Sequence, residues 1–322
     1  YGFLLRPGMI PYSPHSDVIA EHLATKTALY QSLQEGRGIP FWRPDQFSGY
    51  AGLVNPQALY TYPLHLLFYL LPPAEAVGGT FWLHFLAGGV GLYLMGTVLG
   101  LGLWARLLMA AAGLFNFKLL MATYAGWLAI IPSIVLFPAV FAAVVHAANR
   151  PGPGAALAAA LAGGLCLHAG HLQLIYYAVL FAVAYLAGRS FCWVRAGQWR
   201  RLLATAGWLS CGGVLAVGLS AYLLLPLAAE APLVSRSKTS YEFFLAGHAL
   251  RPQHLLTLLY PEALGTPLDH SYADSEELWE DVAYFGIVPL LLGVAAVALG
   301  WRRAPVRLLC LGLLASMVLA TD

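Results

Sequence analysis

The sequence predicts an all-α integral membrane protein, a polytopic bundle of transmembrane helices. Of its 322 residues, 60% are hydrophobic and 10% are charged, and the mean hydropathy is +0.70. An ordinary soluble domain contains about 25% charged residues. Several charge-free runs are also long enough to cross a hydrocarbon core, which takes about 20 helical residues. A lipid bilayer is therefore the expected partner. A net charge of +2 argues against a nucleic-acid partner, which requires a clustered basic face.

About eight transmembrane helices are predicted from these runs. The charge-free run 151–188 is nearly twice the length of a membrane-spanning helix, so we expect it to fold back at His168-Ala169-Gly170-His171. The predicted spans are 79–100, 105–121, 127–148, 154–168, 172–188, 203–226, 284–300 and 306–320. Four regions follow: an outer loop with interfacial helices (1–78), six transmembrane helices (79–227), a second outer loop (228–283) and two further transmembrane helices (284–322).

The basic residues predict the orientation, because Lys and Arg close to membrane ends are retained in the cytoplasm. Alternating the spans places nine of the seventeen basic residues on one side, which is then cytoplasmic. All fifteen acidic residues fall on the opposite side. This segregation indicates an extracytoplasmic working surface, although the acids of the two long loops also serve solubility. The nine basic residues are Arg106, Arg150, Arg189, Arg195, Arg200, Arg201, Arg302, Arg303 and Arg307.

Asp17 and Glu21 are the candidate catalytic acids of the first outer segment. Asp17 lies at or beside the N-cap of a helix predicted from Val18 to Gln34, and Glu21 follows one turn later. A carboxylate there can accept a proton from an attacking hydroxyl group. Both carboxylates together can bind a divalent cation through hard oxygen ligands. The alternative is a plain helix cap on a solvated surface.

Aromatic and amide side chains follow in the same segment. Trp42 offers a ring on which a sugar can stack, and Asn55 and Gln57 offer amides that bind hydroxyl groups. Trp and Tyr are also common at any membrane boundary, so composition alone does not separate the two interpretations. The stretch Tyr60–Leu71 is too short to span a membrane and is predicted to form a helix in the interface.

The order of these motifs resembles the YfhO family of bacterial membrane proteins, which is related to the GT-C glycosyltransferases. The similarity extends from about residue 14 to residue 320. The motifs are the early Asp17, Pro40-Phe41-Trp42-x-Pro44-x-x-Phe47-x-Gly49, Asn55-x-Gln57, Tyr62-Pro63, Gly170-His171-x-Gln173 with Tyr176-Tyr177, Trp279-Glu280, and Tyr284-Phe285-Gly286-Ile287-x-Pro289-Leu290.

This resemblance implies a GT-C-like enzyme of the bacterial cytoplasmic (inner) membrane. Such an enzyme takes a sugar from a polyprenyl-phosphate carrier and places it on an extracytoplasmic glycan or lipid acceptor. An acidic residue of the first outer loop serves as base or metal ligand, and by position it maps to Asp17. No Asp-x-Asp pair is present, which leaves a Mg²⁺ or Mn²⁺ site at Asp17 and Glu21 in doubt. A further transmembrane helix is expected before Tyr1, so we interpret the chain as a fragment.

Further candidate site residues are polar groups at the ends of the predicted spans. His171 and Gln173, at the turn after the span 154–168, are expected near Asp17, with simple turn formation as the alternative. Lys118 is predicted to meet a carrier phosphate or to reach the interface by snorkelling. In the second outer loop Arg236, Lys238 and Arg251 are candidate phosphate ligands. Glu280 is a candidate for the acceptor side, and solvation is the alternative for the neighbouring acids.

Three functions are compatible with the sequence. A glycosyltransferase with Asp17 as base is favoured by the ordered motifs and the segregated acids. A lipid or polysaccharide transporter or flippase would place charged residues deep within several spans, and apart from Lys118 the spans contain almost none. A noncatalytic assembly protein does not explain why aromatics, amides and acids concentrate in one outer segment.

Overall fold

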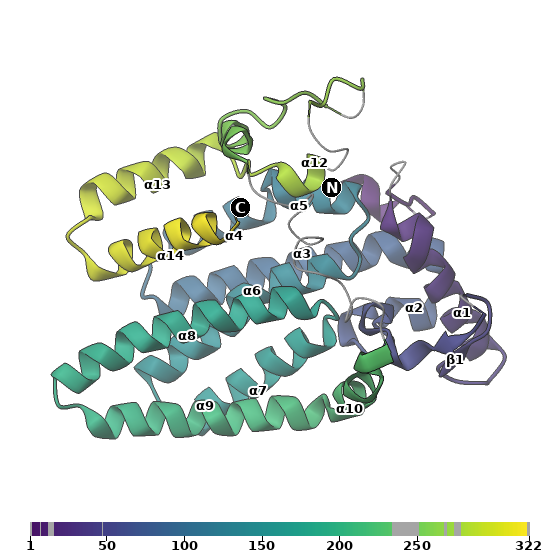
Figure 1. Ribbon diagram of the computed structural model, residues 1–322, viewed down its shortest axis with the longest axis horizontal. Coiled ribbons are helices and arrows are strands. Elements are labelled where there is room, and N and C mark those ends of the chain that lie inside the picture. Colours follow the sequence, from purple (N-terminus) through teal and green to yellow (C-terminus); the bar gives the residue numbers. More distant parts are fainter. Residues whose placement is uncertain are drawn as a thin grey trace. The chain divides into compact units, whose positions relative to one another are not determined.

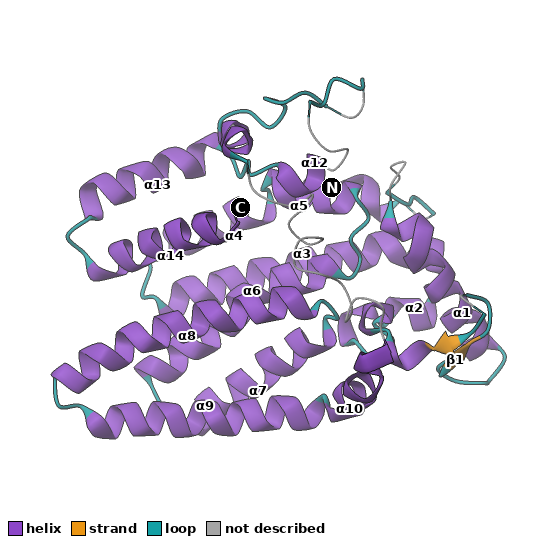
Figure 2. Ribbon diagram, viewed as in Figure 1, coloured by secondary structure: helices purple, strands orange, loops and turns teal. Residues whose placement is uncertain are grey.

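The protein is helical almost throughout, which confirms the all-α prediction. The computed structural model describes residues 2–6, 8–11, 16–46, 48–233, 251–266, 269–273 and 278–320. Within these ranges the strands are β1 (Trp42–Arg43) and β2 (Tyr50–Ala51), which pair antiparallel with Trp42 opposite Ala51 (Figure 2). The chain divides into two compact units. The first comprises Tyr1–Leu114 and Thr123–Pro232, and the second comprises Phe115–Ala122 and Leu233–Asp322.

The first unit contains the long helices and the segment that precedes them (Figure 1). Short 3-10 helices cover Gly2–Leu5, Gly52–Val54, Pro56–Ala58 and Pro63–His65, and a π-helical turn covers Val18–His22. The α-helices are α1 (Leu23–Gln34), α2 (Leu67–Leu70), α3 (Pro73–Val98), α4 (Leu103–Leu114), α6 (Ile130–Asn149), α7 (Pro153–His168), α8 (Leu172–Arg195), α9 (Trp199–Leu219) and α10 (Ala221–Glu230).

The second unit is built from shorter helices. Its helices are α5 (Phe117–Tyr124), whose last two residues belong to the first unit, a 3-10 helix at Pro252–Leu258, α12 (Leu278–Asp281), α13 (Ile287–Gly300) and α14 (Ala304–Ala320). Asn116 caps α5, because its Oδ1 accepts a hydrogen bond of 2.7 Å from the backbone N–H of Leu119. The rings of Phe117 and Tyr284 pack edge to face with their centroids 6.0 Å apart.

Five helical segments among the described residues are long and apolar enough to cross a membrane, which indicates a multi-pass membrane protein. They are α3, the segment Leu103–Tyr124 that contains α4 and α5, α6, α8 and α9. The predicted count of eight is not supported. The helices α7, α13 and α14 have 16, 14 and 17 residues, and at about 1.5 Å per residue they fall short of a hydrocarbon core about 30 Å thick.

Two predictions about local structure are confirmed and one is corrected. The helix expected over 18–34 is present as the π-helical turn and α1. The fold-back at 168–171 is present, with Gly170 at φ +83° between α7 and α8. The interfacial helix expected over 60–71 is reduced to Pro63–His65 and α2. Pro63 and the extended backbone at Leu71, before Pro72, limit it.

The helices of the first unit run back and forth between two ends. We call one the basic end, because its turns at 99–102, 150–152 and 196–198 are flanked by arginines. There the side chain of Asn149 donates to the carbonyl of Val98 at 3.1 Å, and Arg201 donates to the carbonyl of Ala148 at 2.9 Å. The other, which we call the polar end, contains the turns at 125–129 and 169–171, the break at Ser220 and the first 72 residues.

Small residues allow the helices to approach closely, as expected for membrane helices. A Cβ added to Gly212 of α9 would lie 2.7 Å from the carbonyl oxygen of Ala156 and 2.7 Å from the Cβ of Ala159 on α7. A Cβ on Gly88 of α3 would lie 3.0 Å from the Cβ of Val135 on α6. The α7–α9 and α3–α6 contacts therefore depend on glycine, which has no Cβ, at positions 212 and 88.

We expect Gly212→Ala to destabilise the protein by about 1–3 kcal/mol, because the added methyl group overpacks against α7 backbone. Gly213→Ala is the matched control, since nothing lies within 4 Å of a Cβ at that position. There the higher helix propensity of Ala should leave stability unchanged or raise it by up to about 1 kcal/mol. Thermal unfolding in detergent measures both variants. Equal stability of the two variants would contradict the α7–α9 packing.

Candidate functional site

The start of the first helix is anchored on the polar end. The backbone N–H of Asp17 donates to the carbonyl of Ala125 at 3.0 Å. The turn containing Ala125 also includes Gly126, at φ +73°, where a Cβ would collide with Ser16 and with the backbone of Val18. This close approach places Asp17 beside the turn that leads into α6.

Asp17 and Glu21 lie at the π-helical turn that begins this helix. The backbone of Asp17 occupies the N-cap position of this turn, and its side chain makes no capping hydrogen bond there. Glu21 accepts a hydrogen bond from the amide of Asn55 at 3.4 Å. Both carboxylates are half-buried. π-Helical turns are frequent at functional sites, and the sequence pattern gave no sign of this one.

Asn55 connects the π-helical turn that contains Glu21 to the turn between α7 and α8. Its Oδ1 accepts a hydrogen bond of 3.0 Å from the backbone N–H of Gln57 and so caps the helix Pro56–Ala58. Gly170 packs against this helix: a Cβ at this position would collide with the carbonyl oxygen of Pro56 and lie 2.8 Å from Leu59 Cδ2. His171, half-buried, follows Gly170 directly. The structure therefore brings the predicted site residues Glu21, Asn55, Gln57 and His171 into one neighbourhood.

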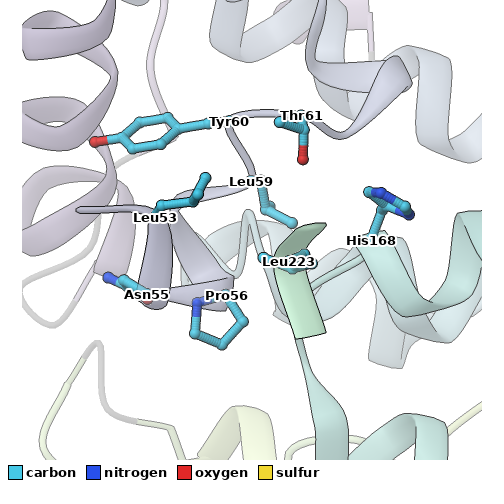
Figure 3. Close-up of a pocket in the computed structure, with 8 residues that line it drawn as sticks. All are labelled: Leu53, Asn55, Pro56, Leu59, Tyr60, Thr61, His168 and Leu223. Atoms are coloured by element: carbon cyan, nitrogen blue, oxygen red, sulfur yellow. The ribbon is translucent and has the colours of Figure 1, made fainter. Parts of the chain in front are cut away.

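A small pocket opens between this segment and the helices α7 and α10. Its volume is about 10 Å³, about one water molecule. In Figure 3 Leu59 points from the segment toward His168 of α7 and Leu223 of α10. The pocket is lined by Leu53, Asn55, Pro56, Leu59, Tyr60, Thr61, His168 and Leu223.

His168 is held in place by three hydrogen bonds. Its Nε2 lies 2.8 Å from the hydroxyl of Tyr222, and its Nδ1 lies 2.8 Å from the carbonyl of Gly164 and 3.3 Å from the hydroxyl of Ser220. The sequence grouped His168 with His171, but it did not indicate the pairing with Ser220 and Tyr222. The break at Ser220 between α9 and α10, two residues after Gly218, brings these two residues to His168.

Two predicted site residues point elsewhere. The amide of Gln173 donates to the hydroxyl of Tyr177 at 2.8 Å, one turn further along α8, and both side chains are exposed. Trp42 is 60% exposed on the β1–β2 hairpin, where its ring lies against Gly49. The ring is exposed to a ligand, and its predicted role in sugar binding stays a prediction.

The buried Arg43 joins the half-exposed Asp45 of the hairpin to Tyr60 of the pocket wall. The guanidinium of Arg43, 1% exposed, donates to both carboxylate oxygens of Asp45 at 2.8 and 2.6 Å and to the hydroxyl of Tyr60 at 3.2 Å. These hydrogen bonds from Arg43 lower the pKa of Asp45. Burial raises the pKa of Tyr60, so its hydroxyl stays protonated at neutral pH. Trp42, the neighbour of Arg43, is in this way positioned on a fixed hairpin.

A buried cluster of basic side chains lies beneath the pocket, and sequence reasoning missed it. The ammonium group of Lys26 is 1% exposed, donates to the carbonyl of Ala58 at 2.6 Å and lies 5.0 Å from the centre of the Phe68 ring. The rings of His65 and His84 meet at right angles with centroids 5.4 Å apart, and Tyr62 stacks on His84. No spacing rule of α-helices or strands predicts this cluster, because its residues come from three separate elements.

Burial sets the protonation of this cluster. It lowers the pKa of Lys26 to about 7. Burial, followed by the charge of Lys26, lowers the pKa of His22 to about 3. The pKa of His65 falls well below its usual value for the same reasons, with smaller effects from His84 and His22. The histidines His22 and His65 are therefore neutral at physiological pH.

The remaining predicted residues belong to the second unit. The ammonium group of Lys118 donates to the carbonyls of Trp279 and Glu280, both at 2.6 Å, so the structure brings Lys118 and Glu280 together through the backbone of α12. Arg251 is exposed at the start of the helix Pro252–Leu258. The predicted roles of Lys118, Arg251 and Glu280 toward substrate stay predictions. Arg236, Lys238, Glu276 and Glu277, together with Pro14, His15 and Phe47 of the first segment, lie outside the described residues.

The described residues contain no group of three or more His, Cys, Asp or Glu side chains that could hold a metal ion. Asp17 and Glu21 supply two carboxylates, and Glu21 also accepts a hydrogen bond from Asn55. Mg²⁺ is often held by one or two carboxylates together with waters and substrate phosphates, so a metal site at Asp17 and Glu21 stays a prediction.

Comparison of the chain with models of known protein families, with curated proteins and with solved structures finds no match. The similarity to the YfhO family therefore stays a prediction from the motifs.

Lys26→Met should flatten the pH dependence of stability between about pH 7 and 9.5. In the folded protein Lys26 loses its proton above pH 7, whereas in the unfolded chain it stays protonated up to about pH 10.4. Because the unfolded state then binds more protons, stability rises with pH across this window, by at most about 1.4 kcal/mol per pH unit. Met preserves the length of the side chain and removes the titration.

Thermal unfolding midpoints in detergent, measured every half pH unit, test this expectation. Glu35→Gln is the control: it also changes one charge, at the exposed end of the same helix, and should retain the slope of the wild type. A Lys26→Met variant with an unchanged slope would show that the buried amine does not titrate in this window.

Proposed function

We propose that this protein is a glycosyltransferase of the bacterial inner membrane that moves a sugar from a polyprenyl-phosphate carrier to an extracytoplasmic glycan or lipid acceptor. The observation that supports it most is the arrangement at the polar end. There the half-buried Glu21 accepts a hydrogen bond from Asn55, whose segment packs against Gly170, and the half-buried Asp17 lies one helical turn before Glu21. Such an arrangement presents a base and hydrogen-bonding groups next to apolar helices that can receive a lipid-linked substrate.

The orientation of the proposed enzyme follows from the opposite ends of the first unit. Arginines flank the turns of the basic end, and no Asp or Glu occurs between Glu75 and Glu230. By the positive-inside rule the basic end is cytoplasmic, so the polar end faces outward. The carrier lipid would then present its sugar to Asp17 on the outer face.

Asp17 would act as the general base. It takes the proton from the acceptor hydroxyl, whose oxygen attacks the anomeric carbon of the sugar, and the bond from that carbon to the phosphate oxygen breaks with its electron pair. The products are the glycosylated acceptor and the free polyprenyl phosphate, with inversion at the anomeric carbon. Because the phosphate is a tolerable leaving group, orientation of the reactants and one base suffice.

The sugar would occupy the surface between Trp42 and Gln57. Trp42 presents an exposed ring for stacking. Asn55 can bind a hydroxyl through its amide while it orients Glu21. A pocket of about 10 Å³ does not hold a sugar ring, so we assign to it one hydroxymethyl or hydroxyl group at most, next to Thr61.

Asp17→Asn should reduce transfer by about 100-fold or more, the usual contribution of a general base. The assay uses full-length protein in vesicles, a panel of polyprenyl-phosphate sugars labelled in the sugar, and membrane extract as acceptor. Glu35→Gln, which removes an exposed carboxylate of the same segment, is the matched control and should retain full activity.

Undiminished transfer by Asp17→Asn would overturn the role of Asp17. If the wild type moves the labelled carrier across the bilayer without forming a glycosylated product, the protein is a flippase and the proposal is wrong.

A further inference from the structure

The basic end of the first unit holds six arginines and no carboxylate. In the described structure none of these guanidinium groups forms an ion pair with a carboxylate. Arg106 is satisfied locally, because it donates to the carbonyl of Leu101 at 2.6 Å and lies over the ring of Tyr93. The six are Arg106, Arg150, Arg189, Arg195, Arg200 and Arg201.

Two of these arginines converge on one buried ring. Trp193 of α8 is 4% exposed, and the guanidinium carbons of Arg189 and Arg201 each lie 5.3 Å from its centroid. Arg189 comes from α8 and Arg201 from α9. Like charges repel, so this pair is held together by the attraction of each guanidinium to the aromatic ring.

The two guanidinium groups are held in different ways. Arg201 donates from Nη2 at 2.9 Å and from Nε at 3.2 Å to the carbonyl of Ala148 at the end of α6. Arg189 stacks on Trp193, and its buried Nε has no hydrogen-bond partner among the described residues. A guanidinium held by a ring and not by a carboxylate keeps its positive charge uncompensated for an anion.

Tyr185 completes the arrangement one turn before Arg189 on the same face of α8. Its ring packs edge to face on Phe141 of α6, with centroids 5.2 Å apart. Contacts from α6, α8 and α9 therefore hold two guanidinium groups at the ring of Trp193, with Tyr185 one turn before Arg189. We call Tyr185, Arg189, Trp193 and Arg201 the arginine site.

We propose that the arginine site binds the phosphate of an anionic phospholipid. Paired guanidinium groups suit phosphate oxygens, and basic pockets between membrane helices on the cytoplasmic side bind lipid headgroups. Arg189 lies six residues before the end of α8, about 9 Å along the helix, near the level of the headgroups. The helices α8 and α9, which hold the site, are apolar and mostly exposed, so they offer surface to acyl chains, which favours a lipid over free phosphate.

The test uses the full chain in detergent micelles doped with either phosphatidylglycerol or phosphatidylcholine. Lipid retention by native mass spectrometry and the shift of the unfolding midpoint are measured against lipid concentration. We expect saturable binding of phosphatidylglycerol, about fivefold weaker binding in Arg189→Gln, and about 25-fold weaker binding in the double variant Arg189→Gln/Arg201→Gln.

The control is the double variant Arg195→Gln/Arg200→Gln, which removes the same charge from the same end. Arg195 lies over the exposed ring of Phe191, away from Trp193. We expect the control to bind phosphatidylglycerol within about twofold of the wild type. The buried Nε of Arg189 has no hydrogen-bond partner among the described residues, so the unfolding midpoint of Arg189→Gln in phosphatidylcholine should match the wild type even if Arg201→Gln perturbs folding.

Three outcomes would overturn the proposal. One is equal weakening in the site and control variants, which would mean that only net charge matters. Another is equal binding of phosphatidylcholine and phosphatidylglycerol. The third is full competition by millimolar inorganic phosphate, which would indicate a site for the free ion. None of these outcomes bears on Asp17, whose role is tested by sugar transfer.

Discussion

The buried amine of Lys26 is the interaction on which the polar end depends. Its hydrogen bond to the carbonyl of Ala58 joins α1, which begins near Asp17, to the loop that forms the pocket. Leu59, the next residue, has φ +52°, and this left-handed turn directs Tyr60 and Tyr62 inward. Burying a charged ammonium group is costly, and a pKa of about 7 shows how the fold accommodates it: the amine is readily neutral while it still donates. Substitution of Lys26 therefore affects both α1, which follows Asp17 and Glu21, and the pocket wall.

Contacts between backbones position the rest of the site. Gly126 lets the chain at Ser16 and Val18 approach the turn before α6, and Gly170 lets the turn after α7 approach Pro56. Both glycines have positive φ, so a side chain would introduce strain as well as a collision. Asp17 and Glu21 thus belong to a segment that packs against two helix ends, at Gly126 and at Gly170. Preorganisation of this kind is what a base needs to stay within reach of an acceptor hydroxyl.

Local sequence patterns predicted much of this fold. The features that they did not predict depend on packing between helices. The helix after Asp17, the turn at Gly170 and the apolar helices follow from caps, glycine and hydropathy. The count of eight spans failed because hydropathy does not reveal how long a helix is: α7, α13 and α14 have 16, 14 and 17 residues. Of the candidate site, Glu21, Asn55, Gln57 and the Gly170–His171 turn lie in one neighbourhood. The contacts of Lys26 and Tyr222 were not predicted, because they join elements distant in sequence. The Arg189–Trp193–Arg201 contact was not predicted, because it depends on how α9 packs beside α8.

The two ends of the first unit handle charge in opposite ways. At the polar end the buried cation Arg43 is matched by Asp45, and the amine of Lys26 is readily deprotonated. At the basic end no carboxylate is near in sequence, so arginines use backbone carbonyls and aromatic rings instead. Carbonyls and rings orient a guanidinium group without neutralising it. The positive charge of the basic end therefore stays available to anionic groups of the membrane. The polar end instead presents the carboxylates of Asp17 and Glu21 beside its helix turns.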